Sequence, residues 1–144
     1  MKKKIDYFNK TKIAYEYMCK DLCNEYGINQ TCFDILMFLG NNPEYKYASD
    51  IVDVRKIKAN LVSINVDKLV NEGFLIKEAV KEDKRKTKLV CTLKANEFVK
   101  KGRKVQRKFH DLMFKEIDEE TKETFFKTLE KIENNVEEIF KETR

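Results

Sequence analysis

The sequence contains very little proline and glycine. Of its 144 residues, one is proline and four are glycine. Tight turns depend on these two residue types, so their scarcity argues against a fold of many short strands. Lys, Glu, Leu, Ile and Phe are abundant instead, which favours long helices. The composition predicts one mainly α-helical domain, large enough to bury its own core.

Long apolar runs are also missing. No stretch reaches the roughly 18 apolar residues that span a membrane. The basic start, residues 1–4, is not followed by the apolar segment of a signal peptide. We therefore expect a cytoplasmic protein, in which Cys19, Cys23, Cys32 and Cys91 are reduced thiols rather than disulfides.

Histidine is represented by His110 alone, and the sequence contains no motif of a Ser-His-Asp set around it. The four glycines stand far apart, at positions 27, 40, 73 and 102, and form no phosphate-binding loop. Carboxylates are numerous but follow helix faces that are expected to face solvent. These absences predict that the chain is not an enzyme and that it uses no cofactor or metal.

Charge is distributed unevenly along the chain. Residues 76–108 carry 13 Lys and Arg against 4 Asp and Glu, whereas residues 109–144 carry 6 against 11. The basic middle of the chain indicates a face that binds a polyanion. The acidic end indicates another face that is kept away from that polyanion. A well-solvated surface would have the same composition, so charge alone does not decide between the two.

Hydrophobic periodicity predicts four helices in the first half. Apolar residues recur every three or four positions from Ile5 to Glu25, and residues 31–39 are apolar almost all round, as in a buried helix. Two shorter helices follow at about 50–55 and 58–72, and Gly73 ends the second. Two short helices joined by a few residues form a helix-turn-helix.

The second half predicts a hairpin and two further helices. Leu75–Val80 and Thr87–Thr92 have the composition of strands, on either side of a charged tip at 81–86. A hairpin after a helix-turn-helix is a wing. Residues 94–116 and the segment after Asp118 show the apolar stripes of amphipathic helices. The predicted fold class is mainly α with a small β-hairpin wing (α+β).

Two stretches resemble the MarR family of winged helix-turn-helix regulators. Residues 51–73 have that family's apolar pair, turn, polar helix start and terminal Leu-x-x-x-Gly. Residues 82–92 contain the Asp-x-Arg and Leu-x-x-Thr of its wing. The family often has Gly where this chain has Lys56, Arg in place of Ile64, and Gly in place of Asn96. These departures fit the fold, but Ile64 leaves the DNA sequence open.

The resemblance implies a single domain of residues 1–144, in which 31–93 form the DNA-binding module. Helices within 1–30 and 94–144 would form a homodimer, because their apolar stripes are too long to be covered by the module alone. Two recognition helices would then address an inverted repeat with half-sites about one helical turn apart. We expect a repressor that covers a promoter.

The predicted DNA contacts lie on the recognition helix and on the wing. On the helix, N-terminal residues can reach base edges while lysines suit phosphates. These residues are Lys58, Asn60, Leu61, Ser63, Ile64 and Lys68. On the wing, Asp83 can orient Arg85 toward a narrow minor groove, with Lys84 and Lys86 on phosphates. Ordinary packing, helix capping and a solvated hairpin are the alternatives.

Three further hypotheses remain open. Cys19 and Cys23, one turn apart, could sense an oxidant or a soft metal, although buried cysteine usually serves as a small apolar side chain. The winged helix could serve protein contacts only.

The family often binds a small aromatic or phenolic effector in a cleft beside the DNA-binding module. The aromatic residues that could line such a cleft, or simply the core, are Tyr15, Tyr17, Phe33, Phe38, Tyr45, Tyr47 and Phe109.

Overall fold

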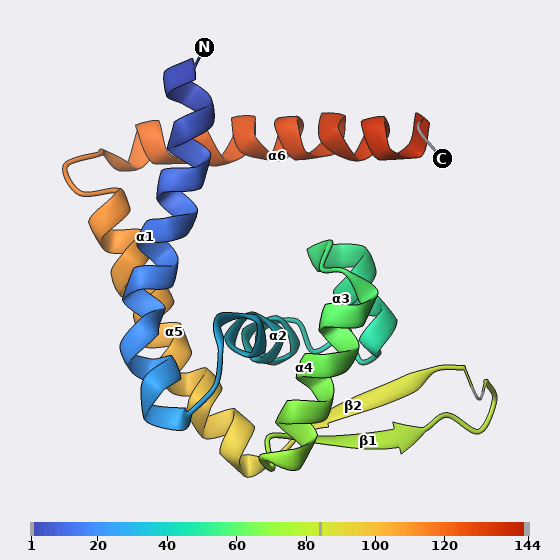
Figure 1. Ribbon diagram of the computed structural model, residues 1–144. Helices are drawn as coiled ribbons and strands as arrows, with labels where there is room; N and C mark the ends of the chain where they lie inside the picture. Colours follow the sequence, from blue (N-terminus) through green and yellow to red (C-terminus); the bar gives the residue numbers. More distant parts are fainter. Residues whose placement is uncertain (1, 84, 143–144) are drawn as a thin grey trace. The chain divides into compact units, whose positions relative to one another are not determined.

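The computed structural model describes residues 2–83 and 85–142. Its elements are α1 (Lys2–Tyr26), α2 (Gln30–Asn41), α3 (Ala48–Arg55), α4 (Ala59–Asn71), β1 (Leu75–Ala79), β2 (Thr87–Cys91), α5 (Leu93–Met113) and α6 (Glu119–Glu142) (Figure 1). The predicted mainly α fold with a hairpin wing is therefore confirmed. In the part of the chain so described, no helix has the length and hydropathy to cross a membrane.

The chain forms two compact units. The first unit ends at Phe109 and the second begins at His110, so the boundary falls within α5. The first unit contains the predicted helix-turn-helix and its wing. The second contains the end of α5 and all of α6, and each unit is described by itself.

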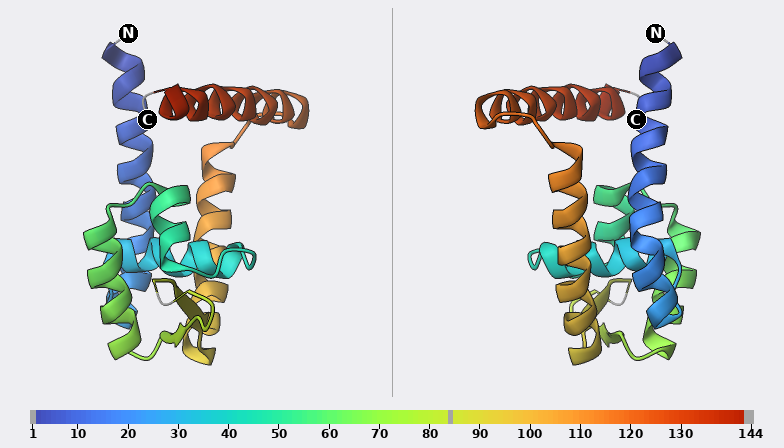
Figure 2. Two further views of the ribbon diagram at one scale, coloured as in Figure 1. Left: turned by 90° about the vertical axis from the view of Figure 1, so that its right-hand side faces the viewer. Right: turned by 90° about the vertical axis from the view of Figure 1, so that its left-hand side faces the viewer.

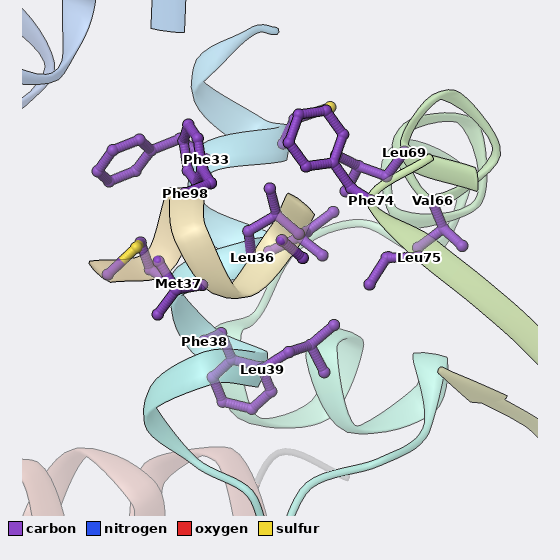
Figure 3. Close-up of a cluster of buried hydrophobic side chains, with 14 of the residues drawn as sticks. Phe33, Leu36, Met37, Phe38, Leu39, Val66, Leu69, Phe74, Leu75 and Phe98 are labelled. Atoms are coloured by element: carbon purple, nitrogen blue, oxygen red, sulfur yellow. The ribbon is translucent and has the colours of Figure 1, made fainter. Parts of the chain in front are cut away.

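Helix α2 is the centre of the first unit and lies across α1 and α5 (Figures 1 and 2). Its residues from Cys32 to Leu39 are buried except Asp34, as the all-round apolar pattern predicts. The rings of Phe33 and Phe98 meet edge to face with centroids 5.5 Å apart, and Phe74 meets Phe98 at 5.9 Å (Figure 3). This cluster joins α2 to α5 and to the start of the wing.

Two glycines let α5 approach α2 closely. A Cβ on Gly40 would lie 2.6 Å from Cγ1 of Val99, and a Cβ on Gly102 would overlap the sulfur of Met37. A side chain at Gly40 would push against Val99, and one at Gly102 would displace the side chain of Met37. The contact fixes α5 against α2, and α5 begins directly after the hairpin, so it also fixes the base of the wing.

The turn between α3 and α4 is only three residues long, 56–58. Lys56 adopts the left-handed conformation with φ of 55°. This position is the one where the MarR family often has glycine, and glycine is the residue that adopts a positive φ without steric cost. Gly73, at the end of α4, has φ of 82° and takes the expected role of a helix terminator.

The wing is a two-stranded antiparallel hairpin in which Leu75 pairs with Cys91 and Ala79 with Thr87. Its second strand is attached to the segment before α3, because the N–H of Leu89 donates to the carbonyl of Lys46 at 2.7 Å. The position of the wing relative to the helix-turn-helix is therefore set by backbone contacts.

The second unit exposes the apolar stripe of its long helix. None of the residues of α6, Glu119–Glu142, is buried, and the side chains of Phe125, Ile132 and Val136 are 43%, 51% and 43% exposed. Asp118 begins the helix as predicted, because its Oδ1 accepts a hydrogen bond of 2.7 Å from the N–H of Thr121. Hydrogen bonding with the side chain of Thr121, and then with its backbone N–H, lowers the pKa of the Asp118 carboxyl.

Candidate nucleic-acid interface

Helix α4 and its N-cap residue Lys58 present to solvent all of the recognition-helix residues predicted to contact DNA. The side chains of Leu61 and Ile64 are 42% and 53% exposed, so packing within the chain does not account for them. Neither Asn60 nor Ser63 caps the helix, because the N-cap position belongs to Lys58. The complete set of exposed predicted residues is Lys58, Asn60, Leu61, Ser63, Ile64 and Lys68.

These residues divide between the centre and the two flanks of the exposed face. At 100° per residue, Asn60 and Ile64 lie opposite the buried stripe of α4. Ser63 lies on the flank that turns toward the wing, where it borders a groove with Thr87 of β2. Lys68 lies on the other flank, beside the start of α2. The centre of the exposed face of α4 therefore consists of the polar side chain of Asn60 and the apolar side chain of Ile64.

The orientation of α4 depends on Asn65, which the sequence analysis missed. Its side chain is buried, and its Nδ2 donates to the carbonyl of Leu61 at 2.8 Å. Its Oδ1 accepts hydrogen bonds from Nδ2 of Asn29 at 2.9 Å and from the thiol of Cys32 at 3.5 Å. Asn29 in turn caps α2. The signal in the sequence was a polar residue on the stripe formed by Val62, Val66 and Leu69.

The wing tip contains the predicted pair of Asp83 and Arg85. Oδ1 of Asp83 accepts hydrogen bonds from the backbone N–H of Arg85 at 3.0 Å and from its Nε at 3.3 Å. The side chain of Arg85 is 92% exposed, so the pair orients the guanidinium without shielding it from a ligand. Lys84 lies outside the described residues.

Other cations fasten the wing to the helix-turn-helix. The ammonium of Lys86 lies 5.0 Å from the ring centroid of Tyr47, the residue before α3. Lys77 of β1 forms an ion pair with Asp67 on the exposed side of α4. The wing therefore meets both helices of the helix-turn-helix, and the carboxylate of Asp67 is balanced by a cation.

A separate hollow of about 600 Å³ lies between α1, α2, α3 and α5. Of the aromatic residues predicted to line an effector cleft, Tyr15, Phe38 and Phe109 are in its wall. The other four predicted residues are not in the wall. Phe33 is fully buried in the core, and Tyr17 is 78% exposed on α1. Tyr45 stacks on Phe38 without lining the hollow, and Tyr47 contacts Lys86.

Charged and polar groups complete the wall of this hollow. Asp34 accepts a hydrogen bond of 3.0 Å from Nε2 of Gln30, and Nη2 of Arg55 lies 3.9 Å from its other oxygen. Burial raises the pKa of the Asp34 carboxyl. Nε2 of Gln106 donates to the hydroxyl of Tyr15 at 3.0 Å, and burial raises the pKa of that hydroxyl. The hollow therefore combines aromatic rings with an acid and a cation.

Burial affects the acidity of the two candidate sensor cysteines, Cys19 and Cys23. Cys19 and Cys23 are buried, and burial raises the pKa of both thiols, that of Cys23 to about 11. A thiol that stays protonated is a weak nucleophile and a weak metal ligand. Within residues 2–83 and 85–142, no group of three or more His, Cys, Asp and Glu side chains could hold a metal ion.

A model of the MarR family matches residues 26–86, from the end of α1 through the helix-turn-helix into the wing. No curated protein sequence matches the chain. The matched segment contains α4, the residues that orient it and the Asp83–Arg85 pair.

Solved structures share the whole architecture. A MarR protein from Peptoclostridium difficile is 21% identical with a TM-score of 0.87, over 97% of this chain and 91% of its own. A MarR transcriptional regulator from Methanosarcina mazei is 18% identical with a TM-score of 0.85, over 96% and 99%. A Listeria monocytogenes protein named as a MarR family regulator, solved with a 26mer DNA, is 18% identical with a TM-score of 0.82, over 94% and 88%. The helix-turn-helix and most of the wing thus match the MarR family, and the chain shares the winged helix-turn-helix fold of these solved proteins.

Proposed function

We propose that the chain is a homodimeric repressor that binds an inverted repeat and is released from it by a small aromatic effector. Residues 31–93 form the DNA-binding module, and residues 1–30 and 94–144 supply the dimerisation helices. The observation that carries the proposal is the wing tip, where Asp83 holds the exposed guanidinium of Arg85. A fixed cation on a projecting hairpin suits the negative potential of a narrow minor groove.

The recognition helix supplies the complementary contact. Asn60 can bond the edge of an adenine, and Ile64 can lie on a thymine methyl group in the major groove. Lys58 and Lys68 suit phosphates on either side of the helix, as Lys84 and Lys86 do on the wing. The solved relative with a 26mer DNA supports this use of the same fold.

The homodimer is supported by exposed apolar side chains on the terminal helices. Besides the stripe of α6, Phe8 on α1 and Leu112 on α5 are 71% and 56% exposed. Apolar side chains that recur along three helices are typical of an interface, and a two-fold interface covers them on both copies. The two recognition helices would then face half-sites about one helical turn apart.

The effector is proposed to occupy the hollow lined by Tyr15, Phe38 and Phe109. Arg55, in the wall of this hollow, is the last residue of α3, and α4 begins four residues later. A ligand that engages Arg55 can therefore shift the recognition helix directly. The ligand would lower the DNA affinity because it binds more tightly to the protein with α4 shifted than to the protein with α4 placed for DNA.

The test is DNA binding by Arg85→Ala. Loss of an oriented minor-groove arginine should weaken binding about 10-fold or more at about 0.15 M salt. The matched control is Arg107→Ala, which removes the same charge from an exposed position on α5. If Arg85→Ala binds as tightly as the wild type, the wing does not contact DNA. The competing hypothesis, a winged helix that serves protein contacts only, would then be favoured.

A further inference from the structure

A groove of about 390 Å³ lies where α3, α4 and the hairpin meet. Its lining includes three hydroxyl-bearing residues, Ser49 from α3, Ser63 from α4 and Thr87 from β2. The lining also includes apolar side chains, of which Val62 and Val66 are buried; the apolar members are Ala48, Val52, Ala59, Val62 and Val66. Hydroxyls from three elements beside apolar side chains suit a ligand that is partly charged and partly hydrocarbon.

The position of this groove follows from the two DNA-contacting elements. Ser63 lies on the flank of α4 that turns toward the wing, and Thr87 lies at the base of the wing. When a recognition helix occupies a major groove and a wing occupies the next minor groove, one sugar-phosphate strand must pass between them. In this chain, the space between these elements is the groove.

We infer that the groove binds one phosphate of DNA together with its deoxyribose, and that the hydroxyls of Ser49, Ser63 and Thr87 donate to the phosphate oxygens. The apolar side chains of the lining then pack against the sugar. This inference rests on the proposed DNA-binding mode. Such contacts set the register of the protein on the duplex without reading the sequence.

Charge around the groove favours a polyanion over a small cation. Residues 77–88 carry six Lys and Arg against three Asp and Glu. Asp67, which would repel a phosphate, is paired with Lys77 at the edge of the groove. Asp53 also lines the groove, and its carboxylate opposes the phosphate. Asp53→Asn should therefore bind DNA more tightly than the wild type.

The hydroxyl contacts have a distinctive salt signature. A neutral donor releases no counterion, so its loss lowers affinity without changing the slope of affinity against salt. We expect Thr87→Val and Ser49→Ala each to weaken binding by about fivefold per protomer, which corresponds to one hydrogen bond. Lys86→Ala, in contrast, should reduce the slope, because a cation that contacts phosphate releases counterions.

The experiment measures the fluorescence anisotropy of two labelled duplexes of mixed sequence, each at several salt concentrations. The matched control is Thr128→Val, the same change at an exposed hydroxyl of α6. Equal losses on both duplexes at an unchanged slope support the inference. Wild-type affinity in Thr87→Val and Ser49→Ala, or a loss on one duplex only, overturns it while the proposed function stands. Absence of salt-dependent binding by the wild type overturns both.

Discussion

Lys56 holds the turn of the helix-turn-helix in a conformation that suits glycine. With φ of 55°, its Cβ crowds the following carbonyl. Lys56→Gly should remove this strain, and part of the gain is offset because glycine loses more conformational freedom on folding. We expect the free energy of unfolding to rise by about 0.5–1 kcal/mol, measured by urea denaturation.

The control for this prediction is Lys58→Gly. Lys58 has an ordinary φ of −57°, so glycine brings only its entropic cost there and should destabilise the chain. If Lys56→Gly lost as much stability as Lys58→Gly, the claim that the backbone is strained at Lys56 would be contradicted.

The buried thiols should react slowly in the native protein. Burial raises the pKa of Cys19, Cys23 and Cys32, so at neutral pH all three stay protonated. Alkylation by iodoacetamide, followed by mass spectrometry, should proceed at a small fraction of the rate in urea. Modification of Cys19 or Cys23 at neutral pH, as fast as in the unfolded chain, would instead favour a redox sensor.

The raised pKa of the Cys23 thiol affects the stability of the fold at alkaline pH. The folded chain holds the Cys23 proton up to a pKa of about 11, more tightly than an unfolded chain. The stabilisation that comes from this difference in pKa is therefore fully present below the ordinary thiol pKa, and it is lost as the pH rises above that value. Denaturation midpoints measured from pH 8 to pH 10 should decrease, and Cys23→Ala should reduce that decrease.

At the scale of elements, much of the fold could be predicted because its signals are local. The stripe of Val62, Val66 and Leu69 places α4, and Gly73 ends it. The pair of Asp83 and Arg85 could also be predicted, since two residues in one tight turn must lie close together. Exposure of Asn60 and Ile64 follows from helix geometry once the buried stripe is known.

Features that depend on the packing between elements could not be predicted. Whether Phe33 or Phe109 lines the hollow depends on how α1, α2 and α5 cross, and periodicity does not specify those angles. Asn65 and Asn29 are 36 positions apart, so their hydrogen bond has no local signature. The hydroxyl groove has the same origin, because its lining comes from three elements.

Asn65 links two of these elements, and its removal should disturb both. Asn65→Leu would leave the amide of Asn29 and the buried thiol of Cys32 without their acceptor, which costs about 1–3 kcal/mol of unfolding free energy. Because the network also orients α4, DNA affinity should fall at a temperature where the variant is still folded. Wild-type stability and affinity in Asn65→Leu would contradict this role.

At the scale of the whole molecule, assembly should depend on the apolar stripe of α6. Ile132→Glu buries a charge in the proposed interface and should give a monomer in sedimentation experiments. Asn134→Glu adds the same charge on the opposite side of the helix and should leave a dimer. Dimeric Ile132→Glu would exclude this stripe from the interface.

The central claim is sequence-specific DNA binding by the dimer. It is tested most directly by the fluorescence anisotropy of DNA from upstream of the chain's own gene, against a shuffled duplex of equal composition. If about six phosphates are neutralised per dimer, affinity should drop roughly 10³-fold between about 50 and 200 mM salt, with tighter binding to the upstream DNA. Weak and equal binding to both duplexes, independent of salt, would contradict the account.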